Sequence, residues 1–205
     1  SNYQTNSIFH PVTFKTEMRV SPTFIFTEGS NYYQLYDSGN TSGINFNRPT
    51  SFEYKNTYGC DVRIARIFNT YGPRMLYNDG RVVCNFIVQA LNNNPITIYG
   101  NGQQTRSFCF VDDLINGLIL LMESKYNKPI NLGNPSELKI LELANIIRSR
   151  INPKLNFTYH PLPDNDPLRR KPIIDLAQKE LEWEPKISLD LGLDKTIEYF
   201  TSTLK

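Results

Sequence analysis

Apolar residues recur at two different spacings along this chain, and the change falls near residue 50. Before it they come in short runs, such as residues 12–14 and 24–27, separated by turn-forming residues, which predicts short strands. From Tyr54 onward, short apolar runs alternate with longer segments in which apolar residues return every three or four positions. That alternation predicts strands and helices in turn. We therefore expect an α/β fold over residues 51–205, preceded by a small β-rich segment over residues 1–50.

The periodicity also predicts the individual elements of the second segment. The predicted strands cover residues 62–68, 96–99, 108–111 and 129–132. The predicted helices cover residues 82–92, a segment with Leu114, Ile115, Leu118, Ile119 and Met122 as its apolar face, and residues 140–150, 175–182 and 189–200. We expect Asp112 and Asp175 to cap their helices, because an aspartate oxygen accepts hydrogen bonds from the free amides of a first turn.

Composition and charge exclude several classes of function. With 205 residues, of which 40% are hydrophobic, the chain can form one sizeable core or a medium domain with a small appendage. The net charge of +2 comes from basic and acidic residues spread along the whole length, so we expect no nucleic-acid partner. No apolar run approaches the ~20 residues that span a bilayer, and we expect a cytoplasmic protein without a membrane partner. The three cysteines show no metal-ligand spacing, so we expect reduced thiols and no metal site.

Three polar segments carry candidate chemistry. In residues 66–74, Asn69 follows a buried strand, where open α/β sheets form their ligand crevice; an ordinary strand-to-loop exit is the alternative. Residues 98–108 form a glycine-rich turn that delivers Arg106 to a strand, where its guanidinium can bind a phosphate through two parallel hydrogen bonds; a simple hairpin is the alternative. Residues 164–172 hold three consecutive cations, which suit either a diphosphate or a solvated loop.

Five segments taken together resemble the UDP-glucuronic acid decarboxylases, a family of extended short-chain dehydrogenases. They read VRIARIFNTYGP (62–73), NDGRVVCNFI (78–87), IYGNGQQTRSFCF (98–110), NLGNP (131–135) and LEWEP (181–185). The resemblance runs in order from Tyr54 to Phe200. It implies a partial extended short-chain dehydrogenase fold, namely the carboxyl-terminal substrate-binding portion, over residues 51–205.

The resemblance also implies a ligand, a cofactor and positions for both. The family uses NAD to oxidise the sugar of UDP-glucuronate at C4, loses the carboxylate as carbon dioxide and returns the hydride, and the cofactor carries the hard chemistry. Family positions that line the UDP-sugar pocket fall on Tyr54, Asn69, Arg81, Val83, Asn85, Thr97, Tyr99, Arg106 and Arg170. Those that reach the nicotinamide end of NAD fall on Thr70 and Arg81. Arg106 and Arg170 would hold the diphosphate, which agrees with the argument from charge.

This sequence departs from the family before Tyr54. The family's glycine-rich dinucleotide loop, its Thr/Ser-Glu pair and its Tyr-x-x-x-Lys dyad belong there, and residues 1–53 contain none of them. Counted back from Tyr54, the dyad positions fall near Asn40 and Ile44, which cannot transfer protons. We therefore expect no catalytic residue in this chain, no decarboxylase activity from it alone, and as partner a complementing cofactor-domain chain or a homodimer.

A second hypothesis rests on the first segment. Residues 1–50, through PVTFKTEMRVSPT (11–23), weakly resemble the terminal β modules of phage tail fibres and other virion surface proteins. The alternative is a virion or surface structural protein that acts through this segment. Binding of UDP would favour the enzyme-derived reading, whereas trimerisation or glycan adhesion through residues 1–50 would favour the structural one.

Overall fold

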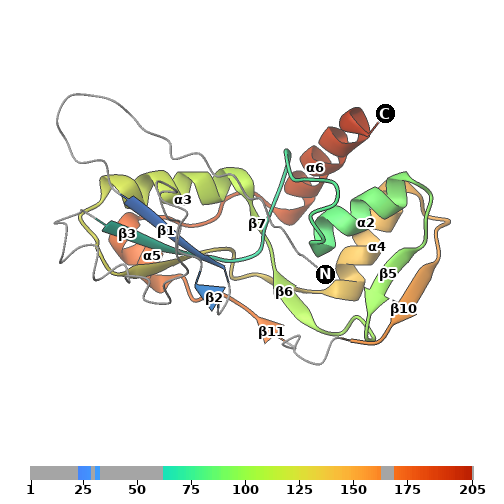
Figure 1. The fold of residues 1–205 in the computed structure, drawn as a ribbon, viewed down its shortest axis with the longest axis horizontal. Helices are drawn as coiled ribbons and strands as arrows, with labels where there is room; N and C mark the ends of the chain where they lie inside the picture. The colour runs from blue at the N-terminus through green and yellow to red at the C-terminus, as the bar shows by residue number, and fades with distance from the viewer. Residues whose placement is uncertain (1–22, 29–30, 33–61, 163–168, 205) are drawn as a thin grey trace, which may run out of the picture.

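The computed structural model describes residues 23–28, 31–32, 62–162 and 169–204 (Figure 1). The strand predicted at residues 24–27 is confirmed as β1 (Thr23–Glu28). The strand expected at residues 12–14, together with Tyr54 and Cys60, lies outside the described residues. In the described part of the chain, no helix combines the length and the apolar character needed to cross a membrane.

A mostly parallel sheet forms one half of the molecule. Its strand order is β2 (Asn31–Tyr32), β1, β3 (Val62–Ile67) and β8 (Pro129–Leu132). β3 pairs in parallel with β1 on one side and with β8 on the other, and its Val62 and Ala65 are buried, as suits a central strand. Because β1 lies within residues 1–50, the two predicted segments contribute to the same sheet; the boundary near residue 50 stays a prediction.

Two helices and a tryptophan cover this sheet. α3 (Val111–Glu123) and α5 (Asp175–Leu181) lie together beside β1 and β3 (Figure 1). Trp183 packs so closely on α3 that a Cβ added at Gly117 would come within 2.9 Å of its ring. The indole Nε1 donates to the backbone oxygen of Asp113 at 3.0 Å. The chain after α5 is thereby fixed on the first turn of α3.

Two expectations about α3 are wrong. The predicted strand at residues 108–111 ends earlier, as β7 (Cys109–Phe110), and Val111 already begins the helix. Asp112 does not cap the helix, since the capping position is Phe110 without a side-chain hydrogen bond. The structural carboxylate is Asp113, which is buried and accepts the backbone N–H groups of Lys186 and Ile187 at 3.0 and 2.9 Å. A distant loop therefore uses the aspartate, not the helix's own amides.

The face that α3 buries also differs from the expected one. Leu114 is buried and Leu118 packs against the core, as expected, but Ile115 and Ile119 are exposed, and Gly117 and Leu121 are buried instead. Asp175 likewise is the first residue of α5, after Ile174 at the capping position, and makes no side-chain cap. Apolar residues cover a wide part of the surface of α3, so the sequence does not fix which side of the helix is buried. The packing of Trp183 on Gly117 places Gly117 on the buried side.

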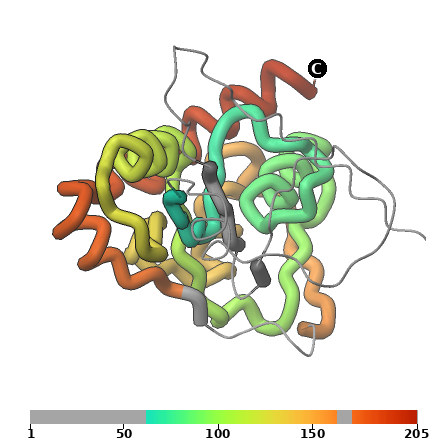
Figure 2. Tube along the Cα trace, turned by 60° about the vertical axis from the view of Figure 1, so that its left-hand side comes forward, coloured from blue at the N-terminus to red at the C-terminus, as the bar shows by residue number. Residues whose placement is uncertain are grey.

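The other half of the molecule holds three helices and a two-stranded sheet. These are α2 (Val82–Leu91), α4 (Ile140–Ile151), α6 (Leu189–Thr203), β5 (Ile96–Tyr99) and β10 (Phe157–His160). They confirm the predicted helices and the strand at residues 96–99. Figures 1 and 2 both show α2 well apart from α3 and α5. Each half has its own cluster of buried apolar side chains.

Short strands connect the two halves. β4 (Thr70–Tyr71) pairs with β7, while β6 (Thr105–Ser107) lies between β11 (Arg169–Arg170) and β9 (Glu137–Lys139). Around β7 the side chains alternate, so that Phe108 and Phe110 join the cluster under α2 while Cys109 joins the one under α3. This period of two lets a single strand contribute to both cores.

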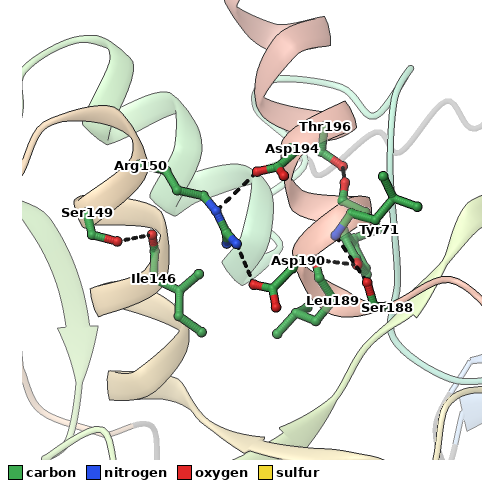
Figure 3. A network of polar contacts seen from close by, with 11 residues as sticks. Tyr71, Ile146, Ser149, Arg150, Ser188, Leu189, Asp190, Asp194 and Thr196 are labelled. Carbon is green, nitrogen blue, oxygen red and sulfur yellow. Dashed lines mark hydrogen bonds and ion pairs between the residues drawn. The ribbon is translucent and has the colours of Figure 1, made fainter.

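Helix α6 is fastened to its neighbours by polar contacts (Figure 3). Arg150 of α4 pairs with Asp190, and its Nε lies 3.1 Å from an oxygen of Asp194 one turn later. The hydroxyl of Tyr71, in β4, donates to the backbone oxygen of Leu189 at 3.3 Å. A Cβ at Gly192 would lie 2.2 Å from that hydroxyl, so this close approach requires glycine. The last helix thus supports the strand that begins at Thr70.

Candidate functional site

A cavity of about 410 Å³ opens where the end of β3 meets α2, β5 and β6. Eight of the predicted site residues lie in its wall: Asn69, Thr70, Arg81, Val83, Asn85, Thr97, Tyr99 and Arg106. They come from segments up to 37 positions apart in sequence (69 to 106), so the fold, not a local motif, brings them together. The wall also includes Met75, Gly80, Val82, Phe86, Gln89, Gln104, Phe108 and Ile140.

The first two residues of the wall are held by backbone contacts at the end of β3. The side-chain amide of Asn69 donates to the backbone oxygen of Ser107 at 3.2 Å, and the backbone oxygen of Asn69 accepts the N–H of Cys109 at 2.9 Å. The hydroxyl of Thr70 donates to the oxygen of Phe68 at 2.9 Å. Asn69 therefore keeps its side-chain oxygen as an acceptor for a ligand.

The start of α2 supplies one cation and one amide. Arg81 stands at the capping position of the helix, and its Nε lies 3.1 Å from a carboxylate oxygen of Asp79. Its side chain is 44% exposed. Asn85, one turn later, donates to the oxygen of Gly80 at 3.0 Å. A cation at a helix start adds to the positive end of the helix dipole, and both favour an anion there.

Strand β5 contributes Thr97 and Tyr99, which are held by the side-chain amides of two glutamines. Gln89 of α2 accepts the backbone N–H of Thr97 at 3.0 Å and donates to its hydroxyl at 3.1 Å. Gln104, buried, donates to the backbone oxygen of Tyr99 at 2.8 Å. Because the Thr97 hydroxyl accepts from Gln89, its own hydrogen is available to a ligand or to a neighbouring hydroxyl.

Arg106 is the buried cation of the site. It is 7% exposed, its Nη1 donates to the oxygen of Thr105 at 2.8 Å, and its backbone pairs with that of Arg170 in β11. The described wall contains two arginines and no Asp or Glu. Two guanidinium groups at one cavity give its wall a positive charge and several N–H donors, so the cavity's chemistry favours a ligand that carries phosphate or another anion.

Some predicted site residues cannot be placed, and others were missed. Tyr54 lies outside the described residues, and so does the side chain of Arg170. Gln89 and Gln104 were not predicted, although both fix the orientation of β5. Gln89 could have been found, because it lies four positions after Asn85 and so on the same helix face. Gln104 lies in an irregular turn, where no period indicates which side chain points inward.

The residues present do not by themselves fit a whole NAD. A dinucleotide-binding fold takes the pyrophosphate at a glycine-rich turn that leads from a strand directly into a helix. Among the described connections, the one before α2 has Gly72 and Gly80 near its two ends, and those before α3 and α4 have none. Within the same described residues, no three His, Cys, Asp or Glu side chains form a group that could hold a metal ion.

Beside the cavity, burial perturbs two thiols and a phenol. Burial, and to a lesser degree the charge of Asp113, raises the pKa of Cys109 from 9.0 to about 12. Burial also raises the pKa of Cys84, whose thiol donates to the oxygen of Leu76 at 2.9 Å. Burial is also the main reason why the pKa of Tyr71 is raised. These groups hold their protons at neutral pH, which makes the two thiols poor nucleophiles.

The raised thiol pKa predicts a loss of stability in alkali. The folded state keeps the Cys109 proton at pH values where the unfolded chain releases it, so this contribution is complete below pH 9 and is lost as the pH rises toward 12. We expect the free energy of unfolding to fall by about 1.4 kcal/mol per pH unit for each such group. Urea titrations between pH 8 and 11 measure it. Cys109→Ala should show a shallower decline, and an equal decline in both proteins would contradict the assignment.

A known family matches the part of the chain that supplies most of this site. The profile of the NAD dependent epimerase/dehydratase family matches residues 50–133. UDP-glucuronic acid decarboxylase 2 of Arabidopsis thaliana is 48% identical over 165 residues, which are 80% of this chain. That alignment spans only 36% of the Arabidopsis protein, so the chain spans about a third of the length of this relative.

Solved structures agree on the fold. UDP-glucose 4-epimerase from Thermotoga maritima, solved with UDP-glucose, superposes with a TM-score of 0.70 and 30% identity over 74% of this chain and 50% of that one. UDP-glucuronic acid 4-epimerase from Bacillus cereus, solved with UDP-glucuronic acid and NAD, gives a TM-score of 0.73 over 92% of this chain and 64% of that one. At 22% identity, the second likeness shows the fold alone. The predicted α/β fold, part of an extended short-chain dehydrogenase, is thereby confirmed.

Proposed function

Because this chain belongs to the NAD-dependent epimerase/dehydratase family over residues 50–133, which contain most of the cavity wall, we propose that the cavity binds a UDP-sugar. The observation that carries the proposal is the wall itself, which joins two arginines to a set of amides and hydroxyls and contains no described carboxylate. Such a wall matches a ligand with a charged diphosphate and many hydroxyl groups. Similarity to relatives that process UDP-sugars supports the choice of nucleotide.

Each group has a part in the proposed binding. Arg106, buried, pairs with the diphosphate through parallel N–H donors, and Arg81 adds a second, more exposed cation. Asn69 offers an acceptor and Thr97 a donor to the neutral parts of the ligand. Arg170 is proposed as a further diphosphate ligand because its backbone pairs with that of Arg106.

We propose UDP-glucuronate, or the UDP-xylose made from it, as the natural ligand. The identity of 48% with a UDP-glucuronic acid decarboxylase supports this choice. NAD, when bound in this family, accepts and returns the hydride. Thr70 and Arg81 would adjoin its nicotinamide end, while the dinucleotide loop and the acid–base dyad have to come from outside these 205 residues. We therefore propose binding without turnover for this chain alone, and activity once a cofactor domain is added.

Calorimetric titration with UDP tests the proposal. We expect saturable binding with one site per chain, and a rise in thermal stability worth about 2.7 kcal/mol when free UDP is a hundred times its Kd. ADP at the same concentrations is the matched control and should bind more weakly. A folded chain that binds neither UDP nor UDP-glucuronate at millimolar concentration would contradict the proposed function.

The structural hypothesis for residues 1–50 gains no specific support. Of the residues that carry its resemblance, 11–23, all but Thr23 lie outside the described part of the chain, and β1, which begins at Thr23, pairs with β3 in the sheet of the second segment. The oligomeric state of the purified protein tests it. A trimer held together by residues 1–50 would revive that hypothesis, and a monomer or dimer would count against it.

A further inference from the structure

The wall of the cavity continues onto the neighbouring strand β10. β5 and β10 are parallel, and their register sets Thr158 opposite Thr97 and His160 opposite Tyr99. Side chains alternate between the two faces of a strand, and directly paired residues lie on the same face. Since Thr97 and Tyr99 both face the cavity, Thr158 and His160 extend the same surface at its edge.

Side-chain contacts agree with that placement. The hydroxyl oxygens of Thr97 and Thr158 lie 3.5 Å apart. The rings of Tyr99 and His160 have centroids 5.9 Å apart and are tilted by 43°. The N–H of Gly100 donates to the backbone oxygen of His160 at 2.8 Å, which fixes the ends of the two strands together. The two rings therefore form an open corner on a rigid backbone.

Both rings of this corner are exposed in the part of the chain that the structure describes. Tyr99 is 48% exposed although it borders a cavity, and His160 is exposed as well. The other face of the β5–β10 sheet is buried, since Ile96 and Ile98 are fully buried there and Phe157 packs on the core. Two planar rings that face solvent next to an anion-binding cavity offer stacking surface to a planar, uncharged part of a ligand.

We propose that His160 is a further specificity-determining residue, which packs with Tyr99 against the nucleobase of the bound nucleotide. This inference rests on the proposed function and deepens it. The arginines of the cavity attract the diphosphate, and the base is the planar part of the ligand that gains from the two rings. The ring nitrogens of His160 can also exchange hydrogen bonds with the polar edge of the base.

Nuclear magnetic resonance of the full chain tests the contact directly. The sequence has two histidines, His10 and His160, so a ¹H–¹³C spectrum contains two Hε1–Cε1 imidazole signals, and His10→Gln and His160→Gln assign them. We expect UDP to shift the His160 signal and inorganic pyrophosphate to leave it in place. A His160 signal that stays fixed while UDP binds, as followed by calorimetry, would overturn the inference and leave the proposed function intact.

Affinities of matched variants give the second measurement. We expect His160→Ala to weaken UDP binding by about threefold to tenfold, the range for one aromatic contact, and to leave the affinity for pyrophosphate unchanged. Tyr159→Ala is the control, since Tyr159 is exposed on the same strand but alternates to the other face. Equal UDP affinity in His160→Ala and the parent would sink the inference alone. Absence of UDP binding by the folded parent would overturn the proposed function and the inference with it.

Discussion

Replacing Arg106 with alanine is expected to weaken the binding of UDP by about a hundredfold, because removal of one partner from a buried charge pair costs 2–5 kcal/mol or more. Arg106 is 7% exposed, so little water surrounds its guanidinium. The proposed hydrogen bonds from Arg106 to a phosphate would therefore be screened less than those of a surface cation. Calorimetric titration of UDP into the parent and the variant measures the effect, and the dependence on salt should become shallower in the variant.

Two further variants test whether the loss of affinity comes from the charge of Arg106. Arg106→Met retains the apolar stem of the side chain, so it should also lose affinity if charge is the cause and should fold as the parent does. Arg81→Ala removes a 44% exposed cation already paired with Asp79, and we expect a smaller loss, about threefold to tenfold. Equal affinity for UDP in the parent and in Arg106→Met would show that Arg106 does not hold the diphosphate.

Trp183→Ala is expected to lower the free energy of unfolding by about 4 kcal/mol, in the range for truncation of a large buried aromatic side chain. The indole is 1% exposed, packs on Gly117 within the cluster that includes Leu132, and donates to the backbone oxygen of Asp113. The variant loses this packing and leaves that oxygen without its indole donor. Because Trp183 is the single tryptophan of the chain, unfolding in urea should be followed by circular dichroism, not by fluorescence.

Ile173→Ala is the matched control, since Ile173 is 70% exposed and adjoins the same helix α5. We expect it to change stability by no more than about 0.5 kcal/mol. Among the described residues, none of the cavity wall belongs to the cluster around Trp183, so Trp183→Ala, while folded, should bind UDP as the parent does. A loss below about 1 kcal/mol for Trp183→Ala would mean that the loop after α5 does not hold the sheet's cover in place.

The sequence by itself determined the elements whose causes are local. The apolar period and the stop at residues 92–95 correctly predicted α2. The apolar patterns after that stop correctly predicted β5, α4 and α6, because helices and strands depend on residues a few positions apart. The family resemblance also nominated eight residues that the structure gathers around one cavity. Several matching segments in a fixed order can indicate the positions of site residues even where no single residue would identify the site.

Only the tertiary structure decided which of several adjacent candidates is used. Asp113 and not Asp112 is the structural carboxylate, because its partners are backbone amides more than 70 positions later. The same distant loop brings Trp183 onto Gly117 and so places that side of α3 in the core. His160 lies beside Tyr99 only because β10 pairs with β5 across 61 positions (97 to 158). Local patterns cannot determine these choices, since the free energy that selects each one comes from contacts that exist only after the chain has folded.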